Sequence, residues 1–179
     1  MKMETLPVET AVEWVTAWTG LSWPVSWETA FAIRDRLGWV SHPKNSRFFV
    51  TSLSTGEADG GMTKDENGLF RGIDFSLATV VVRGQEEPDT AFVTWAAYES
   101  YVEALAGVFG QPRTEVRRRG AESEHRNSKW YLPNRSSFSL TALPGVITVY
   151  VFSPEVTWAD LEDQRLTEEY GENWEDFIE

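Results

Sequence analysis

The side chains best suited to proton transfer lie around His125, in the stretch Glu122-Ser123-Glu124-His125-Arg126. A neighbouring carboxylate can orient an imidazole so that it acts as a general acid or base. The other histidine, His42, precedes Pro43 in a polar segment. The chain has no cysteine, and no serine lies in a glycine-flanked elbow, so no covalent nucleophile is indicated. We therefore expect a solvated His125 and no enzyme, with an enzyme that uses His125 as the second alternative.

Oxygen-bearing side chains gather in the glycine-rich segment 56–72, where Asp59, Asp65, Glu66 and Asn67 are ligand types for a hard cation such as calcium. Their spacing lacks the alternation of an EF-hand loop, which favours an ordinary hairpin loop. The glycines of this segment match neither the dinucleotide-binding nor the P-loop pattern. We expect no cofactor and no metal.

The most distinctive feature is the charge of residues 155–179, which contain ten carboxylates and one cation, Arg165. This segment carries nine of the twelve net negative charges of the chain, and apolar residues are interleaved with its acids. Charge sets the association rate and specificity of a complex, whereas buried aromatic side chains hold it together. The sequence leaves two interpretations open for this tail: a charged helix on the protein surface, or a segment that binds a basic protein. The residues expected to bind the partner are Asp160, Glu162, Asp163, Glu168, Glu169, Glu172, Trp174, Asp176 and Phe177.

The tail is predicted to be helical. Thr157 and Asp160 fit a capping pair for a helix that begins near Trp158. In such a helix Trp158, Leu161 and Leu166 would face inward, and the carboxylates would face water.

Residues 113–135 form a basic island within an acidic protein. The favoured interpretation is that the island pairs with the acidic tail of the same molecule, in contacts that salt would screen. A pI of about 4.6 disfavours nucleic acid and anionic membrane as partners. With no signal peptide and no long apolar run, we expect a cytoplasmic protein. The cations of the island are Arg113, Arg117, Arg118, Arg119, Arg126, Lys129 and Arg135.

The elements that position these residues follow from periodicity and from start and stop signals. Helices are predicted over 7–19 and 27–37, the latter with Ser26 as N-cap, and a long middle helix ends before Gly110. Alternating stretches predict three strands before the long helix and three after it, with residues 113–129 as a loop. The predicted fold is a single α+β domain with a mainly antiparallel sheet of five to six strands. We expect a core of residues 1–154 and an acidic helical appendage of residues 155–179.

Four short segments form a recognisable pattern: Leu21-Ser22-Trp23 with Trp27, Leu37-Gly38-Trp39, Val108-Phe109-Gly110-Gln111-Pro112 and Trp130. This pattern resembles a family of uncharacterised small acidic bacterial proteins, whose members are similar to immunity proteins of polymorphic toxin systems. The resemblance covers roughly residues 12–153, and it implies an immunity protein that binds and occludes a cognate basic toxin, with a nuclease as one candidate. The alternative is a small acidic secretion chaperone that binds an effector segment. A monomer is expected for the immunity protein and a homodimer for the chaperone.

Overall fold

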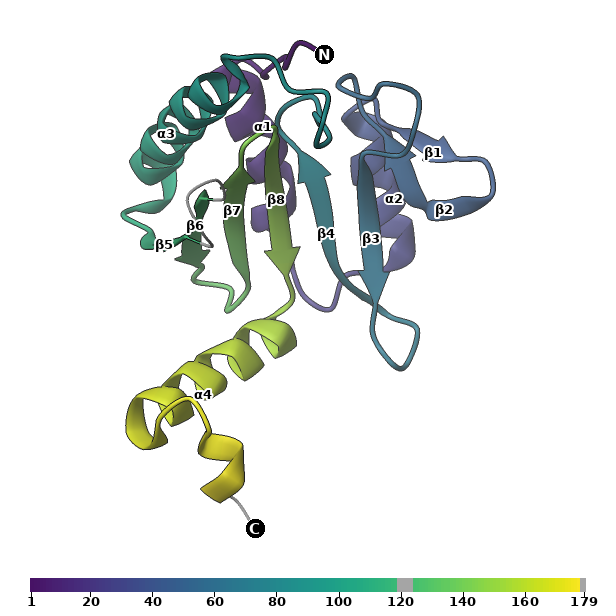
Figure 1. Cartoon of the computed structure of the whole chain (residues 1–179). Coiled ribbons are helices and arrows are strands. Elements are labelled where there is room, and N and C mark those ends of the chain that lie inside the picture. The colour runs from purple at the N-terminus through teal and green to yellow at the C-terminus, as the bar shows by residue number, and fades with distance from the viewer. Residues whose placement is uncertain (119–123, 178–179) are drawn as a thin grey trace.

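The computed structural model describes residues 1–118 and 124–177 as one α+β domain around an antiparallel sheet of eight strands. The strand order is β1-β2-β3-β4-β8-β7-β6-β5, so the first four strands and the last four meet at β4 and β8. Figure 1 shows α1 and α2 behind the sheet and α4 extending from its lower end. The strands are β1 (Val40–His42), β2 (Asn45–Val50), β3 (Gly60–Lys64), β4 (Phe70–Ser76), β5 (Arg113–Arg118), β6 (Glu124–Tyr131), β7 (Ser137–Leu143) and β8 (Val146–Phe152). The helices are α1 (Val8–Thr19), α2 (Trp27–Arg36), α3 (Thr90–Phe109), α4 (Pro154–Tyr170) and the short 3-10 helix η1 (Trp174–Phe177).

One face of the sheet is buried by helices and the other is open. On β8, Ile147, Val149 and Val151 are buried, whereas the alternate residue Tyr150 is exposed. Successive side chains of a strand point to opposite faces, so the register of the sheet carries this division from strand to strand, except at the edge strand β5, every residue of which is exposed. Helices α1 and α3 pack against the buried face at β7 and β8. We call the opposite side the open face.

Aromatic side chains fill the space between the helices and the buried face. Trp39 stacks on Phe49 with 4.8 Å between ring centroids, and Trp14 meets the edge of Trp39 at 5.0 Å. A second pair, Trp130 and Phe138, stacks at 4.7 Å beneath β6 and β7. Trp23 and Trp27 pack on Phe70 and belong to this layer. The aromatic layer therefore accounts for most of the tryptophans without a binding role.

The predicted helices are confirmed, including the Ser26 cap, whose hydroxyl accepts a hydrogen bond from the backbone N–H of Thr29. The sheet has eight strands, whereas five to six were predicted. The sequence pattern does not indicate β3 or β5, and β6 begins earlier than the pattern predicts. Strand β3 starts with Gly60 and Gly61, and in sequence a pair of glycines is typical of a turn. Every residue of β5 is exposed, so this edge strand has no apolar alternation to reveal it. The loop predicted for 113–129 was therefore wrong for β5 and β6.

Gly60 of β3 is required by the packing of the core. A Cβ atom at this position would overlap the ring of Phe49, its cross-strand partner. We expect Gly60→Ala to destabilise the fold by about 1 to 3 kcal/mol, as overpacking does in other cores. Gly107, which is exposed inside α3 with open space around it, is the matched control. Gly107→Ala should stabilise the fold by about 1 kcal/mol through helix propensity. Urea denaturation of both variants measures the difference, and equal effects would contradict this account of β3.

Candidate functional site

Helix α4 starts at the end of the sheet's last strand, earlier than its sequence suggested. Ser153, the residue after β8, is the N-cap and its hydroxyl accepts a hydrogen bond from the N–H of Val156. Pro154 follows as the first helical residue, where its missing N–H costs nothing. The predicted capping role of Thr157 is therefore wrong. Its side chain is buried, and its hydroxyl lies 2.8 Å from that of Ser137 on the open face of β7.

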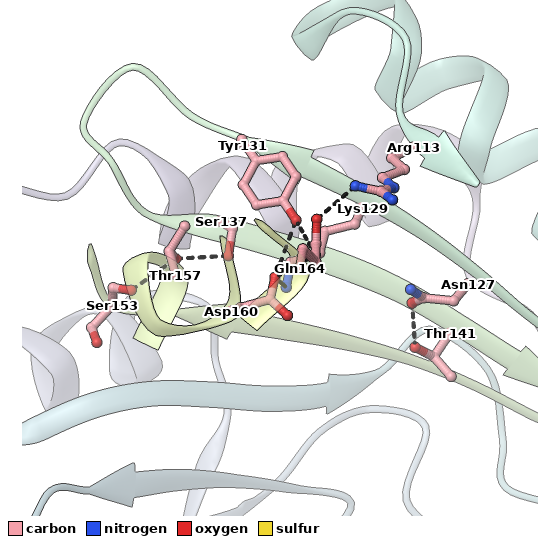
Figure 2. Close-up of polar contacts among 10 residues, drawn as sticks. All are labelled: Arg113, Asn127, Lys129, Tyr131, Ser137, Thr141, Ser153, Thr157, Asp160 and Gln164. Atoms are coloured by element: carbon pink, nitrogen blue, oxygen red, sulfur yellow. Dashed lines mark hydrogen bonds and ion pairs between the residues drawn. The ribbon is translucent and has the colours of Figure 1, made fainter. Parts of the chain in front are cut away.

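The first turns of α4 contact the sheet through a polar stripe. Asp160 is its centre, because one carboxylate oxygen, Oδ2, accepts hydrogen bonds from Lys129 Nζ at 2.7 Å and from Tyr131 OH at 3.1 Å. Gln164, one turn later, donates to the same oxygen and to Tyr131 OH, and accepts from Arg113 at 2.6 Å. Figure 2 shows these side chains converging from α4, β5 and β6. We call this set the Asp160 clasp.

The clasp holds Asp160 in its charged form. Partial burial works against the charge, but the hydrogen bond and positive charge of Lys129 and the hydrogen bonds from Tyr131 and Gln164 outweigh it. The pKa of Asp160 is therefore lowered from its ordinary value of 3.8. A carboxylate with this pKa and these partners is a structural anion rather than a proton acceptor in catalysis.

Two of the three apolar residues predicted to face inward, Trp158 and Leu161, are exposed instead, which corrects that prediction, whereas the third, Leu166, is half-buried. Trp158 is 68% exposed and Leu161 is 43% exposed. The physical reason is that the sheet surface beneath α4 carries the polar residues Lys129, Tyr131 and Ser137, so the polar stripe of the helix docks there. Beside Trp158 and Leu161 lies a groove of about 590 Å³, whose other walls include Leu132, Arg135 and Pro154.

Most of the predicted partner-binding carboxylates contact residues of the same chain. Glu162 and Glu169 pair with Arg165 at 2.7 and 2.6 Å. Within these exposed pairs the charge of the helix is partly compensated, at small energetic effect. The remaining predicted residues lie as follows: Glu168 is 3.8 Å from Arg113, Asp163 accepts a hydrogen bond from the indole of the half-buried Trp174, Glu172 and Asp176 are exposed, and Phe177 ends η1 with its side chain outside the described residues.

The basic island meets the tail at two of its cations, Arg113 and Lys129, through Asp160, Gln164 and Glu168. The expectation that island and tail pair within one molecule is confirmed for these contacts. Arg126 instead pairs with Glu124 at 2.7 Å and lies over the ring of Trp95. Arg119 lies outside the described residues.

His125 lies on β6 opposite Arg117 of β5, and the acidic-turn residues Asp59 and Asp65 accept hydrogen bonds within the chain. Glu124 accepts its hydrogen bond from Arg126, not from His125, and Glu122 lies outside the described residues. Asp59 accepts from the N–H of Thr51, and Asp65 accepts from the backbone of its own turn. Across residues 1–118 and 124–177, no group of three or more metal-ligating side chains comes together.

Sequence reasoning named Lys129 as a cation that pairs with the tail, but it did not identify Tyr131 as a contact of α4. It placed Trp158 and Leu161 on the inward face of α4, whereas the structure exposes both. Thr157, Asp160 and Gln164 follow the i, i+3, i+7 spacing of one helix face. This spacing indicates a polar face on α4. The same pattern is expected for a polar face that packs on the sheet and for one that faces water. Only the structure of the sheet surface distinguishes the two.

A model of the family described as "Family of unknown function (DUF6301)" matches residues 9–153. The matched region ends at the N-cap of α4, so it contains the sheet and the first three helices. No curated protein and no solved structure gives a significant match to the chain. None of the helices in the described part of the chain combines the length and apolar character that crossing a membrane requires.

Removing the central carboxylate should loosen α4 from the sheet. We expect Asp160→Ala to accelerate amide hydrogen exchange in α4 by about 5- to 30-fold, which corresponds to about 1 to 2 kcal/mol of local stability. Glu169→Ala is the control, because Glu169 pairs only within its helix, with Arg165. Exchange in α4 that responds equally to both substitutions would contradict the clasp.

Acid should release α4 in the same way. Because the pKa of Asp160 is lowered in the folded protein, its contribution to stability is complete above the unfolded value of 3.8 and is lost as pH falls through the lower, folded value. We expect the NMR signals of Lys129 and Tyr131 to shift toward their Asp160→Asn positions below about pH 4. In Asp160→Asn itself these signals should respond little to pH, and an identical response in both proteins would contradict the assignment.

Proposed function

The chain belongs to the DUF6301 family of unknown function, and we propose that it is a binding protein for a basic protein partner, with α4 as its principal contact surface. The observation that carries this proposal is the orientation of α4. The clasp holds α4 with Trp158 and Leu161 exposed to solvent, on a helix that also carries exposed carboxylates. Exposed apolar side chains rimmed by charge are typical of protein interaction sites.

The arrangement supports the two steps of protein recognition. A net charge of −12, concentrated in residues 155–179, attracts and orients a basic surface. Trp158 then provides the kind of aromatic anchor that contributes most of the energy in many interfaces. The groove beside it offers apolar walls for one side chain of the partner. In this proposal Trp158, and not Trp174, is the anchor, because the indole N–H of Trp174 already donates a hydrogen bond to Asp163.

The specific role that we propose is immunity: the protein occludes the substrate cleft of a cognate basic toxin, for which a nuclease is one candidate class. A nuclease cleft is cationic because it binds phosphates, so an acidic helix complements it. Supporting this role are the acidity of the tail, the exposed anchor and the resemblance of the segments around Trp23, Trp39 and Trp130 to immunity-like proteins.

A secretion chaperone remains a second candidate because of one observation at the sheet edge. Strand β5 is exposed along its whole length and, within the described part of the chain, pairs on one side only, with β6. An extended segment of an effector can add to such an edge as a further strand. This mode would use backbone hydrogen bonds rather than the Trp158 anchor.

The immunity proposal is tested by isothermal titration of the purified chain with each basic protein that the adjacent genes encode. We expect one partner with nanomolar affinity, and Trp158→Ala should weaken it about 30-fold or more, as loss of an interface hot spot does. The matched control is Phe92→Ala, since Phe92 is another large aromatic side chain and is 76% exposed on α3. Weak, salt-abolished binding to every protein would overturn the proposal. A homodimer that binds extended peptides and ignores Trp158→Ala would support the chaperone instead.

A further inference from the structure

Asp74 lies at the centre of the open face, on the middle strand β4. One cross-strand row joins it to its neighbours, because Asp74 pairs with Gly61 of β3 and with Tyr150 of β8. The row continues through Ser139 to Lys129, which the clasp holds. Asp74 and Lys129 are therefore three strand spacings apart, about 14 Å, on the same face.

Aromatic rings flank the Asp74 carboxylate on both sides. Tyr150, 38% exposed, is its direct neighbour on β8. Phe48 of β2, 44% exposed, covers the glycine on the other side, with its Cδ1 only 3.1 Å from where a Cβ atom of Gly61 would lie. An Asp74 oxygen lies 3.8 Å from the same point. Gly61 thus lets the Phe48 ring approach the carboxylate.

This carboxylate has no partner among the residues that the structure describes. Neither a hydrogen-bond donor nor a cation contacts it, and it is half-buried. Burial alone raises its pKa from 3.8 to about 6. At neutral pH the protein therefore maintains a partly desolvated negative charge between two aromatic rings, which is unfavourable unless something compensates it.

The same face contains a completed version of this arrangement. Lys129 Nζ bonds Asp160 at 2.7 Å while lying 5.1 Å from the ring centroid of Phe152 and 5.5 Å from that of Tyr131. Phe152 in turn stacks on Tyr150, with rings only 4° from parallel. Next to Phe152 lie the ammonium of Lys129 and its partner carboxylate, Asp160. Next to Tyr150 lies the carboxylate of Asp74 without a cation among the described residues.

We propose that Asp74, with Tyr150 and Phe48, forms a receptor for one lysine or arginine side chain of the basic protein partner. The cation would bond the carboxylate and lie against the ring of Tyr150, as Lys129 does with Asp160 and Phe152. The nature of the partner rests on the proposed function, whereas the site rests on Asp74 and its surroundings. It gives the partner a second contact, separate from Trp158 on α4.

A small probe tests the site without the partner. We would titrate the full chain with N-acetyl-arginine amide and follow backbone NMR signals, using the isosteric but uncharged citrulline derivative as the control ligand. Saturable shifts at Phe48, Gly61 and Tyr150 are expected for the arginine probe only. Asp74→Asn should lower its affinity about tenfold or more, since a charge-assisted hydrogen bond is lost. Tyr150→Leu, which keeps the carboxylate, should cause a smaller loss.

The controls separate this inference from the proposed function. Asp74→Asn removes a buried charge, so it should fold normally and melt at a higher temperature at pH 7. Asp160→Asn should leave probe binding at Asp74 unchanged. Equal binding of the citrulline derivative, or shifts confined to α4 and insensitive to Asp74→Asn, would overturn the receptor site. Failure of the partner titration with retained probe binding would overturn the immunity role and leave the receptor site standing.

Discussion

The architecture depends on the fact that the sheet buries only one of its two faces. Tryptophan and phenylalanine side chains seal the helix-covered face, from Trp14, Trp39 and Phe49 at one end to Trp130 and Phe138 at the other. Because side chains alternate along each strand, the neighbours of a residue that points to the helix-covered face point to the open face. This division places the polar residues on the open face, and it therefore determines which side of α4 can pack there.

The open face explains the position of α4. An apolar helix surface placed on Ser137, Lys129 and Tyr131 would bury polar groups without partners, which costs more than leaving a tryptophan in water. The helix therefore docks through Thr157, Asp160 and Gln164 (Figure 2) and leaves Trp158 and Leu161 exposed. The same polar contacts that attach the helix thus create the exposed surface on which the proposed function rests.

Two carboxylates on the open face illustrate how surroundings set the behaviour of identical groups. Asp160 has a lysine, a tyrosine and a glutamine around it, and its pKa is lowered. Asp74 has aromatic rings and no donor among the described residues, and its pKa is raised. The first is satisfied within the chain and acts as a clasp. The second is where we infer that a partner supplies the missing cation, because the chain contains a completed model of the same pairing in Lys129.

Sequence alone determined the properties that depend on neighbouring residues: the helices and their Ser26 and Gly110 ends, the α+β class, and the acidity of the tail. These follow from local capping, periodicity and charge, which need no knowledge of distant contacts. Tertiary structure alone decided the eight-strand sheet, the side of α4 that faces solvent, and the row that joins Asp74 to Tyr150. Each depends on strand register between residues far apart in sequence, and helical periodicity identifies the two faces of α4 but not which one the sheet accepts.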